Sequence, residues 1–82
     1  MTKRRTLDVL IGERLRIARE MNGLKQKEVA QKVGYSNQHF SRIELGERSA
    51  SLDLLLRLMK IYNKQPEFFL KDILEFTKRD ER

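Results

Sequence analysis

Four side chains in the middle of the sequence share hydrogen-bonding chemistry and a helical spacing. They are Asn37, Gln38, Ser41 and Arg42. The apolar Phe40 and Ile43 lie between and after them, so a helix over 37–45 would turn the polar four outward, starting at its N-terminal end. A helix that enters the major groove of DNA with its N-terminal end requires such a face. The spacing favours DNA reading over the alternative, an ordinary helical hairpin with a polar surface.

Other kinds of chemistry lack the residues that they need. The chain has no cysteine, so it offers no thiolate nucleophile, no disulfide and no cysteine-based zinc site. His39 is the single histidine, so no pair of imidazoles can bind a metal, and the carboxylates are scattered. The four glycines stand singly and form no phosphate-binding loop. The sequence therefore predicts no enzyme, no cofactor or metal, and no small-molecule substrate.

The positive charge of the chain is confined to its first half. The net charge is +6, and through Arg42 there are ten Lys and Arg residues against four Asp and Glu. From Ile43 onward the two kinds are equal, at eight each. This asymmetry is typical of a surface that binds a polyanion, nucleic acid before membrane. The alternative, a merely solvated surface, is about as well supported by charge alone.

Length and composition predict one all-α domain over residues 1–82. Eighty-two residues cannot divide into two independent cores, and 39% hydrophobic residues suffice for one. One proline and four glycines leave few turns for a sheet sandwich. No apolar run approaches the roughly 20 residues that a bilayer requires, and no signal-peptide pattern opens the chain. We therefore expect a soluble, cytoplasmic protein that binds no membrane.

Five helices are expected to position the polar face. Their predicted ranges are 7–21 or 10–21, 26–33, 37–45, 52–62 and 66–78. Gly12 lies inside the first helix and weakens its pattern slightly. The second and third are joined by only three residues, where Gly34 suits a tight left-handed turn and Ser36 can cap the third helix. This pair, residues 26–45, is predicted to be a helix-turn-helix unit.

The stretch from Ile11 to about Leu70 resembles a known family. Its "LKQKEVAQKVG" is similar to the family's "LTQEELAEKLG", and its "FSRIELGERSASLDLLL" to "ISRIERGERNPSLETLL". The family is the lambda-repressor-like, or XRE-type and Cro-like, helix-turn-helix family of bacterial and phage regulators. The resemblance implies a five-helix domain that binds operator DNA as a dimer and represses or activates transcription. The chain departs from the family at Lys25, where a capping Ser or Thr is usual, and at Asn63, where glycine is usual.

The resemblance assigns base reading to the outward face of 37–45. Asn37 and Gln38 match the pair that reaches base edges, and Arg42 matches a further base-reading position. Glutamine pairs with adenine through two hydrogen bonds, and arginine pairs with guanine in the same way. Ser41 is small enough to let the helix lie deep in the groove.

The same match implies contacts with DNA phosphates. Gln26 is expected to meet a phosphate at the start of the second helix, where free N–H groups suit an anion. Lys25 and Arg48 would hold phosphates on either side of the groove, and Ser36 belongs to this set. His39 could touch a phosphate or a thymine methyl group. The alternatives are that Lys25 and Arg48 are solvated surface charges and that His39 is an incidental polar neighbour.

Two further features would support the recognition helix. Arg19 and Glu44 resemble an ion pair that, in this family, joins the first helix to the end of the third. Such a pair positions the recognition helix rather than touching bases. Residues 1–6, with Lys3, Arg4 and Arg5, could be a basic arm that follows the DNA backbone or a minor groove, or a frayed terminus.

The C-terminal helices are expected to form a twofold dimer interface. Helix 52–62 should turn Leu55, Leu58, Met59 and Tyr62 inward. That leaves Leu54 and Ile61 without an internal partner, and helix 66–78 has two apolar stripes, of which one would stay exposed. The predicted contact residues are Ile61, Leu70 and Leu74. Two recognition helices about 34 Å apart require a pseudo-palindromic operator, and the alternative is that both stripes fill the core of a monomer.

Two functions stay open at this point. The leading one is a stand-alone repressor or controller protein that regulates transcription at a specific sequence, since no ligand or protease domain follows the DNA-binding unit. The alternative is an antitoxin-type interaction module, which binds a toxin through its C-terminal helices and autoregulates its operon. Antitoxins usually have a longer C-terminal segment, and only about six residues follow Phe76, which favours the regulator.

Overall fold

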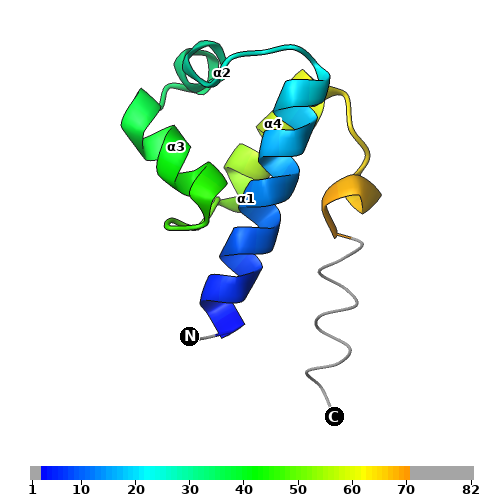
Figure 1. Cartoon of the computed structure of the whole chain (residues 1–82). Helices are drawn as coiled ribbons and strands as arrows, with labels where there is room; N and C mark the ends of the chain where they lie inside the picture. The colour runs from blue at the N-terminus through cyan, green and yellow to red at the C-terminus, as the bar shows by residue number, and fades with distance from the viewer. Residues whose placement is uncertain (1–2, 71–82) are drawn as a thin grey trace.

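Helices account for the secondary structure of the computed structural model, which describes residues 3–70, with side chains from Leu7 onward. They are α1 (Lys3–Met21), α2 (Gln26–Val33), α3 (Asn37–Leu45) and α4 (Leu52–Tyr62), followed by a helical segment described over residues 66–70. Figure 1 shows α1 beside α3, with α2 near the C-terminal end of α1. The predicted all-α class with five helices is confirmed, and the part of the fifth helix beyond residue 70 lies outside the described residues.

α1 begins earlier than the sequence predicted. It starts at Lys3, so residues 3–6 form its first turn rather than a separate arm, and neither Leu7 nor Leu10 marks the start. Lysine, arginine and leucine are favourable in helices, and no glycine or proline interrupts this stretch. The backbone therefore continues the helix toward the N-terminus. A role of residues 1–6 toward DNA stays a prediction.

The turn between α2 and α3 is determined by local backbone geometry. Gly34 has a left-handed backbone, with φ of 77°, and ends α2. The Ser36 hydroxyl accepts a hydrogen bond from the backbone N–H of His39 at 3.0 Å and so caps α3. The predicted bounds 26–33 and 37–45 are confirmed.

Two departures from the family pattern are compensated locally. The Lys25 side chain offers no hydrogen-bond acceptor for the free backbone N–H groups at the start of α2. The Glu28 carboxylate, however, accepts a hydrogen bond from the backbone N–H of Lys25 at 2.8 Å. This hydrogen bond is one half of a capping box, the reciprocal pair of hydrogen bonds found at the start of many helices. At the end of α4, Asn63 adopts a left-handed backbone with φ of 54°, as expected for an asparagine in place of glycine.

The core combines side chains from all the described helices. Its buried members are Leu15, Ala18, Val29, Ala30, Val33, Phe40, Ile43, Leu54, Leu58, Tyr62 and Phe69. The prediction was wrong for Leu54, which is fully buried, whereas Leu55 and Met59 are only half-buried. α4 has apolar residues at nearly every position, so periodicity alone could not decide which of two adjacent stripes faces inward.

Gly12 lies where α1 crosses α3 at close range. A Cβ atom on Gly12 would lie 2.5 Å from the carbonyl oxygens of both Ile43 and Glu44. Only a residue without a side chain lets the two backbones approach this closely. The glycine that weakened the helical pattern in the sequence therefore allows α3 to pack tightly on α1.

Gly12→Ala is expected to lower the free energy of unfolding by about 2 kcal/mol. Overpacking against the α3 backbone outweighs the roughly 1 kcal/mol that alanine gains in helix propensity. Urea unfolding followed by circular dichroism measures the change. Glu13→Ala, at the exposed neighbouring position, is the control and should change stability by less than about 0.5 kcal/mol. A Gly12→Ala variant more stable than the wild type would contradict the close contact.

Candidate nucleic-acid interface

The outward face of α3 carries the four polar side chains that the sequence singled out. Asn37, Gln38 and Arg42 are exposed, and Ser41 is half-buried. The opposite face of α3 is buried against the rest of the domain. Leu45, which is 63% exposed, shares the outward face because it lies one turn after Ser41. The sequence analysis missed Leu45, although the same helical spacing could have found it.

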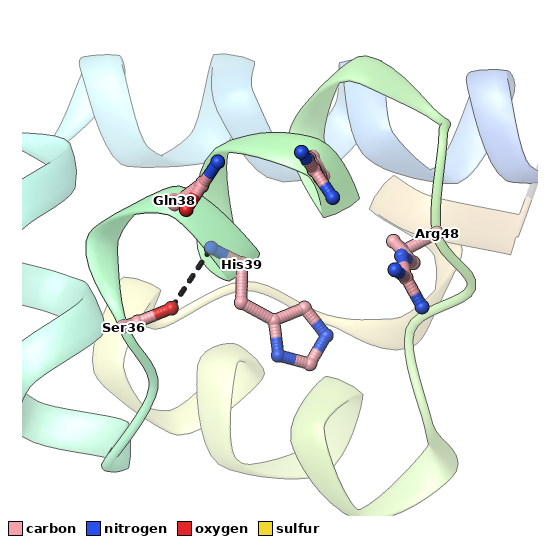
Figure 2. Close-up of a pocket in the computed structure, with 5 residues that line it drawn as sticks. Ser36, Gln38, His39 and Arg48 are labelled. Carbon is pink, nitrogen blue, oxygen red and sulfur yellow. Dashed lines mark hydrogen bonds between the residues drawn. The ribbon is translucent and has the colours of Figure 1, made fainter.

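A hollow opens beside this face and is called the Arg48 hollow below. It is lined by Ser36, Gln38, His39, Arg42 and Arg48. Figure 2 shows Ser36 and His39 at the start of α3, with Arg48 across the hollow on the segment that follows the helix. The structure thus brings two predicted base-reading residues together with three predicted phosphate contacts. No lining side chain is acidic and each can donate a hydrogen bond, so the hollow suits an anion such as a phosphate.

A buried ion pair joins α1 to the end of α3. The Arg19 guanidinium donates to both carboxylate oxygens of Glu44, at 2.8 and 3.1 Å, and to the carbonyl of Leu24 at 2.9 Å. The Glu44 side chain is 2% exposed and that of Arg19 is 11% exposed. The hydrogen bond to Glu44 raises the pKa of Arg19, so the guanidinium keeps its charge. The pair positions α3 and does not itself lie on the outward face.

Tyr62 packs near this ion pair from α4. Its side chain is buried, and its hydroxyl has no hydrogen-bond partner among residues 7–70. Burial raises the pKa of Tyr62 above its ordinary value, and the charge of Glu44 raises it further. The hydroxyl therefore stays protonated, and the ring contributes through packing.

Residues 10–67 match a family model described as a helix-turn-helix domain. The matched stretch includes α2, the turn, α3 and α4, together with much of α1. The chain belongs to this helix-turn-helix family. The XRE-type, lambda-repressor-like resemblance drawn from the sequence is thereby confirmed.

Curated proteins similar to this helix-turn-helix chain are named as HTH-type transcriptional regulators. The HTH-type transcriptional regulator ImmR of Bacillus subtilis is 38% identical over 72 residues, which cover 87% of this chain and 55% of ImmR. An uncharacterized HTH-type transcriptional regulator of Sinorhizobium medicae is 27% identical over 66 residues, 80% of this chain and 48% of that protein. The chain thus spans about half the length of these curated relatives. No solved structure gives a significant match to it.

Two predicted phosphate contacts of the helix-turn-helix lie outside the Arg48 hollow. Lys25 is exposed at the start of α2. Gln26 is half-buried, and its side-chain amide donates to a carboxylate oxygen of Glu44 at 2.9 Å. The Gln26 side chain therefore helps to hold α2 against α3. The sequence did not indicate this contact, because the two residues are 18 positions apart.

An apolar surface lies on α4 and the segment 66–70. Its residues line a pocket and comprise Leu52, Leu55, Met59, Pro66, Phe69 and Leu70. Leu52 is 71% exposed and Leu70 is 42% exposed, and Leu56 on the same helix as Leu52 is 52% exposed. Of the predicted dimer contacts, Leu70 lies on this surface, Ile61 packs partly against the core, and Leu74 is outside the described residues. Leu52 and Leu56 were not among the predicted dimer contacts.

Residues 3–70 contain neither a metal-binding cluster nor a membrane-spanning helix. In this part of the chain, no group of three or more His, Asp or Glu residues is placed to hold a metal ion. None of the helices there has the length and apolar character that crossing a bilayer would require.

Proposed function

We propose that this chain binds a specific sequence of duplex DNA, with α3 in the major groove, and thereby regulates transcription. The observation that carries the proposal is the outward face of α3, where Asn37, Gln38 and Arg42 are exposed beside a hollow lined by hydrogen-bond donors. A helix that presents polar side chains at its N-terminal end is suited to read base edges. Membership of the helix-turn-helix family and the names of the relatives support the same function.

The polar residues around α3 divide into two roles. Gln38 suits adenine and Arg42 suits guanine, each through two hydrogen bonds, while Asn37 reaches a neighbouring base. The half-buried Ser41 lets the helix approach the base edges closely. These residues determine which sequence is preferred.

Phosphate contacts fix the orientation of the helix on the duplex. Ser36, His39 and Arg48 line the hollow beside α3, and Lys25 is exposed at the start of α2. At the start of α2, the backbone N–H groups near Gln26 suit a phosphate, while its side chain is engaged by Glu44. Such contacts contribute affinity without sequence preference.

Arg42→Ala and Gln38→Ala are each expected to weaken binding to the preferred duplex by about 1–3 kcal/mol and to relax preference at one base pair per half-site. The preferred duplex is obtained by selecting bound sequences from a random pool, and affinities are measured by fluorescence anisotropy. Lys25→Ala should weaken preferred and random duplexes equally. Arg16→Ala, an exposed arginine on α1, is the control and should leave preference unchanged. Equal weakening of both duplexes by Arg42→Ala would contradict its base-reading role.

The proposed regulator acts as a homodimer on a pseudo-palindromic operator. The exposed Leu52, Leu56 and Leu70 give α4 and the segment 66–70 an apolar surface that water disfavours. A twofold contact through this surface would cover it, with Ile61 and Leu74 as the further predicted participants. The same contact would present two copies of α3 to successive major grooves, about 34 Å apart.

Leu70→Glu and Leu74→Glu are expected to convert the dimer to a monomer, because each would bury a carboxylate in an apolar contact. Sedimentation velocity of the wild type and the variants measures the change. Leu45→Glu is the matched control for the free protein, since Leu45 is a 63% exposed apolar residue on the outward face of α3, which is not part of the proposed dimer contact. A wild type that stays monomeric at high micromolar concentration, free and on a half-site duplex, would exclude the dimer.

A further inference from the structure

One large apolar side chain stands on the otherwise polar outward face of α3. Within α3, which the structure describes in full, Phe40 and Ile43 are buried in the core, whereas Leu45 is 63% exposed. A single exposed leucine is common on protein surfaces. What Leu45 contacts outside the chain is therefore decided by its position on the helix and by the groups that it would meet there.

Leu45 continues the line of proposed base-reading residues along α3. Four residues lie at the spacing i, i+3, i+4 and i+7, namely Gln38, Ser41, Arg42 and Leu45. Seven residues of α-helix make nearly two full turns, so Leu45 points within about 20° of the direction of Gln38. Some recognition helices use this same spacing to read bases along their length. Leu45 therefore faces the same groove as Gln38 and Arg42.

Leu45 is placed to reach a different base pair from Gln38. Seven residues of α-helix rise about 10 Å, and successive base pairs are about 3.4 Å apart. The Cα–Cβ bonds of a helix tilt toward its N-terminus, so the side chain of Leu45 leans back toward Arg42 and the middle of the helix. With α3 along the groove, Leu45 thus lies about two or three base pairs beyond Gln38.

The chemistry of the major groove identifies the group that an apolar side chain can contact there. The base edges present hydrogen-bond donors and acceptors and, at thymine, a C5-methyl group. Leucine has no polar side-chain atom, so it would cover a donor or acceptor without replacing its hydrogen bonds to water. Contact with the methyl group instead removes apolar surface of both partners from water. Thymine is therefore the base that Leu45 favours.

We propose that Leu45 contacts the C5-methyl group of a thymine in the operator and so determines preference at that base pair. This inference rests on the proposed function and adds to it a specificity-determining residue whose contact is apolar. The neighbours of Leu45 on the same face, Ser41 and Arg42, are polar, so a protein partner would find no contiguous apolar patch there. The thymine lies beyond the base pair read by Gln38, on the side where α3 ends.

The test compares thymine with uracil, which lacks only the methyl group, at one thymine of the selected duplex at a time. At one position in a half-site, uracil should weaken binding of the full wild-type chain about fourfold, the effect of one buried methyl group. Leu45→Ala should weaken binding to the selected duplex to a similar extent and abolish the difference between thymine and uracil at that position. Because alanine is the best helix former and the position is exposed, this variant keeps the fold.

Two further variants and the salt dependence serve as controls. Leu45→Met keeps a large apolar side chain and should still distinguish thymine from uracil. Met21→Ala truncates a 61% exposed apolar side chain outside α3 and should leave the distinction as large as in the wild type. Leu45→Ala should not change the slope of log K against log salt, because it removes no charge. A reduced slope, or a thymine–uracil difference that persists in Leu45→Ala at every position, would overturn the inference.

A second substitution in the DNA distinguishes the two bases that can carry this methyl group. Cytosine and 5-methylcytosine replace the thymine, and the methylated base should bind the wild type about fourfold more tightly than cytosine but bind Leu45→Ala equally. A gain from 5-methylcytosine without one from thymine over uracil would assign Leu45 to methylated DNA and overturn the contact with thymine. If the wild type selects no sequence, the proposed function itself fails; if it selects one and no thymine responds to Leu45, this inference alone fails.

Discussion

Arg19→Met is expected to lower the free energy of unfolding by about 3–5 kcal/mol, as measured by urea unfolding. Methionine keeps much of the volume of the arginine stem but removes three hydrogen bonds, two to Glu44 and one to the carbonyl of Leu24. The Glu44 carboxylate, only 2% exposed, would keep a single donor, the amide of Gln26. Breaking a buried ion pair by removing one partner leaves the remaining charge without a counter-ion and shielded from water, and one amide donor compensates only part of it.

Two variants serve as controls for this result. Arg16→Met makes the same chemical change on the same helix but breaks an exposed pair with Glu20, 3.1 Å apart, so it should cost less than about 0.5 kcal/mol. Tyr62→Phe removes a hydroxyl near the ion pair that has no hydrogen-bond partner among residues 7–70, and should leave stability unchanged or raise it by up to about 1 kcal/mol. If Arg19→Met cost no more than Arg16→Met, the ion pair would not support α3 in the way described.

DNA affinity is expected to fall about 10⁴-fold between 50 and 200 mM salt. If a dimer neutralises about 8 phosphates, the slope of log K against log salt is near −7. The excess positive charge lies in residues 1–42, which include α2 and most of α3. Anisotropy titrations at four or five salt concentrations, on selected and random duplexes, give the slope.

Single-site variants assign the salt effect to particular side chains. Arg48→Ala and Lys25→Ala should each reduce the slope by about 0.9 per bound subunit. Lys60→Ala, an exposed lysine at the end of α4, is a control of equal charge and should leave the slope unchanged. A flat salt response in the wild type, with Lys25→Ala and Arg48→Ala both silent, would refute an electrostatic interface on this half of the chain.

The helix-turn-helix could be predicted because its signals are local. Ser36 caps α3 through the N–H of a residue three positions away, and Gly34 and Gly46 end α2 and α3 with left-handed backbones. The alternation of buried and outward residues on α3 follows directly from helical periodicity. A pattern in which each signal acts within one helical turn can be recognised without knowledge of the rest of the fold.

The apolar pattern of α4 could not be resolved in the same way. Leu54 and Leu55 are adjacent and chemically identical, yet Leu54 is fully buried and Leu55 is half-buried. Which of them faces inward depends on where α4 meets the other helices. The prediction that Leu54 lacked an internal partner was wrong for that reason, and the exposed Leu52 and Leu56 were overlooked.

The sequence by itself determined the polar face of α3 and the helices apart from the start of α1, because caps, glycines and periodicity act over a few residues, and its resemblance to known regulators indicated the family. The tertiary structure alone decided that Gly12 seats α3 on α1 and that Gln26 is bound to Glu44. These contacts join residues ten or more positions apart. They depend on the distance and rotation between whole helices, which are set by how all the buried side chains pack together and cannot be obtained from any single stretch of the chain.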